Sequence, residues 1–241
     1  MQVLGHRGAA ALAPENTWAS FELALKLGVD AIETDVRATS DGELVLVHDE
    51  RLDRTTDGDG LEVRKTSWCI IQTLDAGSWF NAEFRDARVP RLLDTLENFG
   101  RLVHLVLEIK QPGIELDVLE MVNGLDLLND VTFTSFQFEA VNRIKINAPL
   151  AKVGFLTSDV GPANVQHTLD AHIDQFCPPA FSVTRSLVLE WQDLGLEVRA
   201  WGVKNPDLMM RAVEAGVDGM TVDFPHLLLE ALGRHHPSLA C

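Results

Sequence analysis

The sequence predicts a closed barrel of eight parallel strands and eight helices, the (β/α)8 or TIM-barrel fold of the α/β class. Short apolar stretches that read as strands alternate along most of the chain with stretches of helical periodicity. The length of 241 residues is close to the roughly 250 residues typical of one such barrel. No Gly-x-Gly-x-x-Gly turn follows the first strand, which disfavours the alternative of an open, doubly wound sheet.

A short strand and an amphipathic helix open the chain. Residues 3–4 form an apolar pair that is expected to be a strand, and a glycine-rich turn follows it. Apolar residues then recur at helical spacing over residues 18–27. Asn16 or Thr17 is the expected N-cap of this helix, and Gly28 stands just past its last turn. These elements make up the first strand–helix unit.

The second strand carries two carboxylates on one face. It begins at Ala31 and includes Glu33 and Asp35. Because side chains along a strand point alternately to its two faces, these carboxylates point the same way and are separated by about the width of a cation. After an Asp-Gly turn, residues 43–47 form another extended run that places His48 at its end.

Residues 49–89 break the alternation of strands and helices. This stretch is polar, rich in Asp and Gly around residues 57–60, and without clean periodicity. It is too small to fold alone, so we expect an insertion after the second barrel strand that packs over the barrel rim. The whole chain, residues 1–241, is then a single barrel domain.

From residue 90 on, strands and helices alternate regularly. Strands are expected over residues 102–109, 131–134, 152–156, 175–177, 197–203 and 219–222. Helices are expected over residues 92–99, 139–146, 163–171, 186–194, 208–215 and 227–232. With the two N-terminal strands, this rhythm gives the eight strand–helix units of the barrel.

The chain is strongly acidic, with a formal net charge of −16 at pH 7. Nucleic-acid binding requires a basic surface, and anionic membranes repel an acidic protein, so neither partner is expected. An integral membrane segment is not expected either, because the chain has no apolar run of about 18 residues. His6 follows the start too closely for a removable leader, which favours a cytoplasmic location.

Polar and charged side chains gather at the ends of several predicted strands. In a (β/α)8 barrel the active site lies at the carboxyl ends of the strands, so the barrel brings such side chains together. A site for a metal and an anionic substrate requires this inventory, whereas a hydrophobic core does not. The candidate site residues are His6, Arg7, Glu33, Asp35, His48, Glu108, Lys110 and Trp201.

Glu33, Asp35 and Glu108 are the candidate metal ligands. Their hard oxygen donors suit Mg²⁺ or Ca²⁺, with Mn²⁺ as a further candidate. The alternative is that they pair with Arg7 and Lys110 in a structural ion-pair network. The chain has no Cys-x-x-Cys spacing that would indicate a zinc site or a redox pair.

The other candidates suit proton transfer and phosphate binding. His6 and His48 can exchange protons near neutral pH, although a lone histidine at a strand end is more often structural. Arg7 can bind two phosphate oxygens, and Lys110 adds a point charge unless it only pairs with a carboxylate on its own strand. Trp201 forms either an apolar wall for a glycerol or alcohol group or part of the core. The remaining histidines, expected to be structural or solvated, are His104, His167, His172, His226, His235 and His236.

Several short motifs stand in an order typical of one family. They are Gly5-His6-Arg7-Gly8, Pro14-Glu15-Asn16-Thr17, Glu33-Thr34-Asp35, His48-Asp49, Glu108-Ile109-Lys110, Trp201, Gly216-Val217-Asp218-Gly219 and Asp223-Phe224-Pro225. Each motif is weak alone, but together they cover nearly the whole chain. In these motifs the sequence resembles the glycerophosphodiester phosphodiesterase family.

The resemblance implies roles for the candidate residues. Family members use the carboxylates that match Glu33, Asp35 and Glu108 as metal ligands, and the histidines that match His6 and His48 as acid and base. The chain also departs from the family pattern at two motifs, which puts its substrate preference in doubt. The usual Trp-Thr-Val-Asn is replaced by Trp201-Gly202-Val203-Lys204, and the commoner Ser-Phe-Asp by Ser135-Phe136-Gln137.

The predicted function is that of a metal-dependent phosphodiesterase that hydrolyses glycerophosphodiesters to sn-glycerol 3-phosphate and an alcohol. The partner is then a small-molecule glycerophosphodiester, while the oligomeric state stays open. A divalent cation would polarise the phosphoryl oxygens, and Arg7 and Lys110 would hold the charge of the transition state. One histidine would deprotonate the nucleophile, which is water or the neighbouring glycerol hydroxyl, and the other would protonate the leaving oxygen.

Two alternatives stay open. The first is a phospholipase D-like enzyme that acts on lysophospholipid or sphingomyelin head groups, which the insertion at residues 49–89 disfavours because it narrows access to the site. The second is a catalytically silent barrel that binds a metal or a glycerophosphate ligand as a sensor. This second alternative is disfavoured because no part of the motif set is missing.

Overall fold

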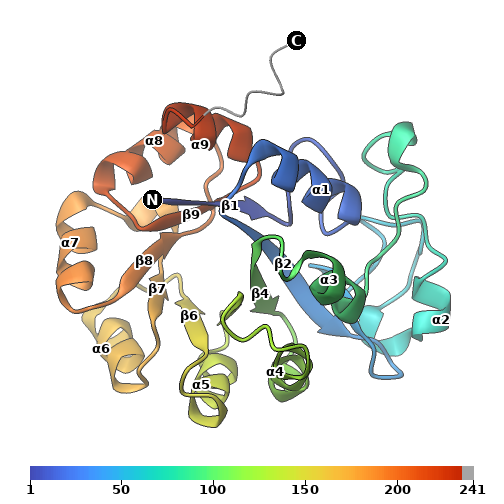
Figure 1. Ribbon diagram of the computed structural model, residues 1–241, viewed down its shortest axis with the longest axis horizontal. Coiled ribbons are helices and arrows are strands. Elements are labelled where there is room, and N and C mark those ends of the chain that lie inside the picture. Colours follow the sequence, from blue (N-terminus) through green and yellow to red (C-terminus); the bar gives the residue numbers. More distant parts are fainter. Residues whose placement is uncertain (235–241) are drawn as a thin grey trace.

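The computed structural model describes residues 1–234 and confirms the predicted barrel (Figure 1). Eight parallel strands close on themselves, because the last strand pairs with the first. His235, His236 and Cys241 lie outside the described residues. In chain order the barrel strands are β1 (Gln2–His6), β2 (Ala31–Ala38), β4 (His104–Ile109), β5 (Val131–Ser135), β6 (Lys152–Leu156), β7 (Gln175–Cys177), β8 (Glu197–Ala200) and β9 (Gly219–Val222).

Helices surround the sheet, and one lies between each barrel strand and the next (Figure 1). No helix within residues 1–234 is both long and apolar enough to cross a membrane. The helices of this ring are α1 (Trp18–Leu27), α3 (Leu92–Phe99), α4 (Glu115–Gly124), α5 (Phe138–Asn147), α6 (Pro162–Asp170), α7 (Arg185–Asp193), α8 (Pro206–Ala215) and α9 (Pro225–Ala231).

Helix α4 is absent from the sequence prediction, although its periodicity is present in the chain. Val118, Leu119 and Val122 are buried and stand three and four residues apart, which is the spacing of one helix face.

The structure also decides between the two candidate N-caps of α1. Thr17 caps the helix by accepting a hydrogen bond from the backbone N–H of Ser20, so Asn16 is free for another contact.

The main hydrophobic core lies between the sheet and the helices, as strand β4 illustrates. Leu105, Leu107 and Ile109 are buried in that core. The alternate residues Val106 and Glu108 point to the other face, which is the barrel interior. Strand β4 thus faces apolar helices on one side and presents a carboxylate to the barrel interior near its carboxyl end.

A hairpin and an irregular segment follow β2. Strand β3 (Leu44–Leu46) pairs antiparallel with β2, and the chain then runs through the short helices η1 (Val63–Lys65), α2 (Trp68–Ile71) and η2 (Ala82–Phe84). The segment lies outside the barrel, on the side of α1 and α3 (Figure 1). A separate buried cluster joins it to the hairpin, made of Val45, Val47, Leu52, Val63, Ile71, Ala76 and Val89.

Two leucines test this description of the core. Leu105 is fully buried on β4, whereas Leu150, in the turn before β6, is 88% exposed. Leu105→Ala should lower the free energy of unfolding by about 2–5 kcal/mol, because it leaves a cavity between sheet and helices. Leu150→Ala should change it by less than about 0.5 kcal/mol. Urea denaturation followed by circular dichroism measures both, and equal effects would contradict the assigned layers.

Candidate active site

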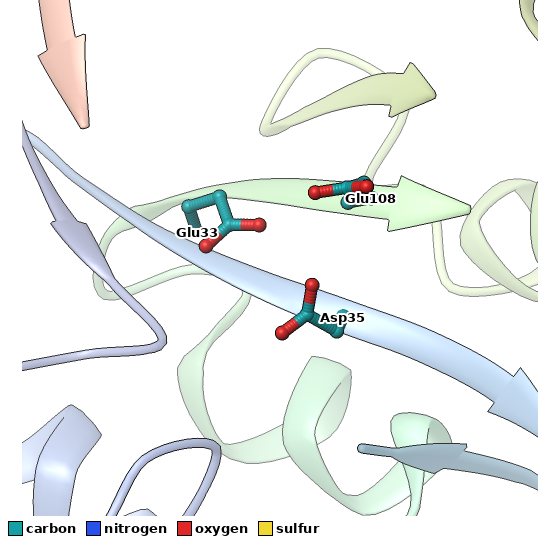
Figure 2. Close-up of side chains that lie close together, drawn as sticks. All are labelled: Glu33, Asp35 and Glu108. Carbon is teal, nitrogen blue, oxygen red and sulfur yellow. The ribbon is translucent and has the colours of Figure 1, made fainter. Parts of the chain in front are cut away.

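Strand register brings three carboxylates together at one end of the barrel. Glu33 and Asp35 lie on β2, and Asp35 pairs in register with Glu108 on β4. One oxygen of each carboxylate lies within 4.8 Å of the others, and all three residues are buried. Figure 2 shows the three side chains directed toward one another from the two neighbouring strands.

These carboxylates perturb one another strongly. Burial and the neighbouring charge of Asp35 raise the pKa of Glu108 to about 7, although Lys110 opposes the shift. Burial and Asp35 likewise raise the pKa of Glu33. Burial would also raise the pKa of Asp35, but Lys110 and Arg7 hold that pKa well below its usual range. The cluster therefore concentrates negative charge in a place where water cannot disperse it.

Two basic side chains neutralise part of this charge. Lys110 Nζ lies 2.6 Å from Glu108 Oε1 and 3.1 Å from Asp35 Oδ1. Arg7 Nε lies 3.0 Å from Asp35 Oδ2. The ion pairs considered as an alternative to a metal site are thus present, but they leave Glu33 without a lysine or arginine side chain within 4.0 Å among residues 1–234.

The donor set nevertheless fits a divalent cation. Three carboxylates face two cationic side chains, and Arg7 is shared with Glu15, so negative charge is left uncompensated when all the carboxylates are ionised. Asp35 Oδ1 is buried and accepts no well-directed hydrogen bond within the described part of the chain. Buried carboxylate oxygens that converge in this way are the ligands that Mg²⁺ and Ca²⁺ prefer.

The Gly-His-Arg-Gly motif forms a tight turn that presents Arg7. The residue has a φ of 52°, in the left-handed region, and its backbone N–H donates to Glu33 Oε2 at 3.2 Å. A side chain at Gly5 would place Cβ only 2.4 Å from the carbonyl oxygen of Gly8, and Gly8 itself has a φ of 90°. The turn therefore requires both glycines.

Asn16 positions the central carboxylate. Its φ is 55°, and its amide Nδ2 donates to Asp35 Oδ2 at 2.8 Å. The amide oxygen accepts from Thr34 Oγ1 at 2.7 Å, which fixes the orientation of the group. Asn16 is therefore a positioning residue of the carboxylate cluster rather than the helix cap.

Each candidate histidine is held by a carboxylate. His6 Nδ1 lies 2.5 Å from Asp223 Oδ1, and His48 Nδ1 lies 2.6 Å from Asp49 Oδ1. Burial would lower the pKa of His6, but the hydrogen bond to Asp223 raises it above its ordinary value. Burial lowers the pKa of His48, and Asp35 opposes this only in part. Both rings are oriented through Nδ1. Nε2 of His48 is left for another partner, and Nε2 of His6 lies 3.9 Å from Glu33 Oε2, beyond hydrogen-bond distance.

A cavity of about 330 Å³ lies over these groups. All eight candidate site residues converge here: seven line the cavity, and Asp35 lies buried beneath it among Arg7, Asn16 and Lys110. Trp201 is half-buried and belongs to the cavity wall, with the ring of Phe136 edge-on at 4.9 Å. The full lining is His6, Arg7, Glu33, His48, Glu108, Lys110, Phe136, Leu156, Arg199, Trp201, Gly202, Val203, Lys204, Thr221 and Asp223.

Several residues of the site were not among the candidates. Asp49 follows His48 directly, and Asp223 lies in one of the quoted motifs, so the sequence near each residue could have identified it as a site residue. No sequence motif pointed to Arg199, which is buried on β8 and donates to Thr221 Oγ1 at 2.6 Å. Conversely, His104 begins β4 at the opposite end of the strand from Glu108 and contacts Thr132, as its expected structural role requires.

Comparisons with a family model and with individual known proteins indicate the same family. Residues 6–227 match the model of the glycerophosphoryl diester phosphodiesterase family. A glycerophosphodiester phosphodiesterase from Caldanaerobacter subterraneus subsp. tengcongensis is 35% identical over 235 residues, which cover 94% of this chain and 96% of that protein.

Solved structures agree with the sequence comparisons. A glycerophosphodiester phosphodiesterase from Agrobacterium tumefaciens superposes with a TM-score of 0.85 at 32% identity, covering 95% of this chain and 99% of that one. A phosphodiesterase from Oleispira antarctica, solved with the product sn-glycerol-3-phosphate, has a TM-score of 0.87 at 29% identity and covers 97% of each chain. This chain is therefore an enzyme of the glycerophosphoryl diester phosphodiesterase family.

Proposed function

We propose that the enzyme is a metal-dependent phosphodiesterase that hydrolyses glycerophosphodiesters to sn-glycerol 3-phosphate and an alcohol. The observation that carries the proposal is the convergence of two carboxylate-bound histidines and three buried carboxylates on one cavity. The Oleispira antarctica relative, solved with sn-glycerol-3-phosphate, supports the assignment of the product. The rest of the chain, including residues 49–89 as an insertion, is proposed to form the same barrel domain.

In this proposal Glu33, Asp35 and Glu108 hold a divalent cation, which is Mg²⁺, Ca²⁺ or Mn²⁺. When bound, such a cation polarises phosphoryl oxygens as a Lewis acid. Its two positive charges offset the negative charge that Arg7 and Lys110 leave uncompensated. The site then attracts a phosphodiester anion even though the chain as a whole carries a net charge of −16.

His6 and His48 exchange the protons of the reaction. Asp223 and Asp49 hold the Nδ1 side of the two rings, so Nε2 of each can accept or donate a proton. One histidine removes the proton of the nucleophile, which is water or the neighbouring glycerol hydroxyl. The other histidine protonates the departing oxygen.

The remaining side chains bind the substrate. Arg7 and Lys110 stabilise the negative charge that builds on the phosphoryl group, and both line the cavity. Trp201 and Phe136 form an apolar wall against which the glycerol or alcohol carbons lie. The cytoplasmic location suggested by the sequence stays a prediction.

His48→Ala tests the acid–base role. We expect release of glycerol 3-phosphate from glycerophosphocholine to fall by roughly 10²- to 10⁴-fold, because a positioned proton-transfer group is lost. An enzyme-coupled assay for glycerol 3-phosphate measures the rate. His172→Asn is the matched control, because His172 is exposed and asparagine tolerates its positive φ. Equal activity of the His48→Ala and native proteins would remove His48 from the mechanism.

Glu33→Gln tests the metal site without relying on turnover. Within residues 1–234 Glu33 pairs with His6 but with no lysine or arginine side chain, so the variant should stay folded. We expect Mn²⁺ affinity, measured by titration calorimetry, to fall by more than roughly 10-fold. Loss of a residue that only hydrogen-bonds to a metal ligand already lowers metal affinity by about that factor. Mn²⁺ at a concentration near its native Kd should raise the melting temperature of the native protein more than that of the variant. Unchanged Mn²⁺ binding would exclude Glu33 as a ligand.

A further inference from the structure

Arg54, in the irregular segment at residues 49–89, contacts two parts of the active site at once. We propose that Arg54 is a positioning residue that fixes His48 through Asp49 and Arg7 through Glu15. The inference rests on the proposed roles of His48 and Arg7. The segment at residues 49–89 then does more than pack beside the barrel, because it also supplies a side chain that holds active-site residues in position.

The contact with Glu15 is a two-pronged ion pair. Arg54 Nη1 donates to Glu15 Oε2 at 2.7 Å, and Arg54 Nη2 donates to Glu15 Oε1 at 2.8 Å. The same Oε1 atom accepts from Arg7 Nη1 at 2.6 Å. Glu15 is therefore clamped between two guanidinium groups, and its position sets that of Arg7. Such paired contacts fix direction as well as distance.

The contact with Asp49 uses the remaining edge of the same guanidinium. Arg54 Nε donates to Asp49 Oδ2 at 2.6 Å, while Asp49 Oδ1 lies 2.6 Å from His48 Nδ1. A carboxylate held in this way favours the His48 tautomer that carries its proton on Nδ1. Nε2 of His48 is then free to accept a proton.

Arg54 also keeps both carboxylates ionised. Burial would raise the pKa of Glu15, but hydrogen bonds from Arg54 and the charge of Arg7 lower it. Burial likewise opposes ionisation of Asp49, yet hydrogen bonds from Arg54 and His48 lower its pKa to about 2. Both acceptors therefore stay charged at neutral pH.

The backbone that carries Arg54 is anchored on both sides. Leu52 is buried in the same apolar cluster as Val45 and Val47, which precede His48. Thr56 donates to the Leu52 carbonyl oxygen through both its backbone N–H and its hydroxyl. One cluster thus fixes the chain before His48 and the turn from which Arg54 reaches back.

The contribution of Arg54 to stability should be small. Its side chain is 45% exposed, and ion pairs in such positions contribute little to the free energy of unfolding. Placement of reacting groups is far more sensitive to small displacements than folding is. A large loss of activity with little loss of stability is therefore the signature of a positioning role.

The test compares Arg54→Ala and Arg54→Lys with Arg51→Ala, in the full chain with Mn²⁺ present. Arg51 is the matched control, since it pairs with Asp53 within the same segment. For both Arg54 variants we expect kcat to fall by roughly 10- to 100-fold, because lysine lacks the fork that spans two carboxylates. The melting temperature should shift by less than about 4 °C. Arg51→Ala should keep native kinetics.

Two further measurements separate positioning from general damage. Added guanidinium at millimolar concentration should restore part of the activity of Arg54→Ala and none of that of Glu15→Gln. The Glu15→Gln and Arg54→Ala losses should not multiply in the double variant, because both act on Arg7 through one contact. Multiplying losses would overturn the Glu15 half of the proposal, and native activity of Arg54→Ala would overturn the whole of it.

Nuclear magnetic resonance of the histidine ring nitrogens reports the His48 tautomer directly, so it tests the positioning role of Arg54 independently of the proposed reaction. We expect the Arg54→Ala variant to lose part of the Nδ1-protonated form of His48, whether or not the enzyme turns over. An unchanged His48 tautomer in that variant would overturn the Asp49 half of the proposal. If the native protein releases no glycerol 3-phosphate while the tautomer shift is observed, the proposed reaction fails and the positioning contact stands.

Discussion

Three buried carboxylates on two adjacent strands are the constraint on which the rest of the site depends. The register of β2 against β4 sets Asp35 beside Glu108, and burial makes their mutual repulsion costly. Lys110 and Arg7 offset only part of that charge, and Asn16 holds Asp35 in place by its amide. The contacts of Asn16, Arg7 and Lys110 therefore hold three carboxylates close together although their charges repel one another.

Much of this organisation could be predicted from the sequence. The alternation of strand and helix patterns predicted the barrel, and the two-residue spacing of Glu33 and Asp35 placed both on one face. The motif order gave the family that the comparisons establish. Even so, the ten residues of α4 were passed over, because a helix whose face holds only a few buried residues between charged positions is easily read as a loop.

The contacts between distant residues could not be predicted. The pairing of His6 with Asp223 exists because β9 closes the barrel on β1, and nothing near either residue indicates the other. Arg54 reaches Glu15 across 39 positions of chain, and Asn16 turned out to hold Asp35 instead of capping its helix. Local patterns specify elements and their faces, whereas such pairs are fixed by register and by closure of the sheet.

The cavity is built unequally by the two halves of the chain. The proposed metal ligands, both histidines and both proposed phosphate-binding cations lie between His6 and Lys110. Later strands supply mainly the opposite wall, with Trp201 and Lys204, together with Asp223, which contacts His6. In the proposed function, the groups that act on the phosphodiester and the wall that contacts the glycerol or alcohol carbons are thus encoded in separate stretches of sequence. Under that proposal, substitutions in the loops after β5 to β8 can change the fit to the substrate while the reacting groups stay unchanged.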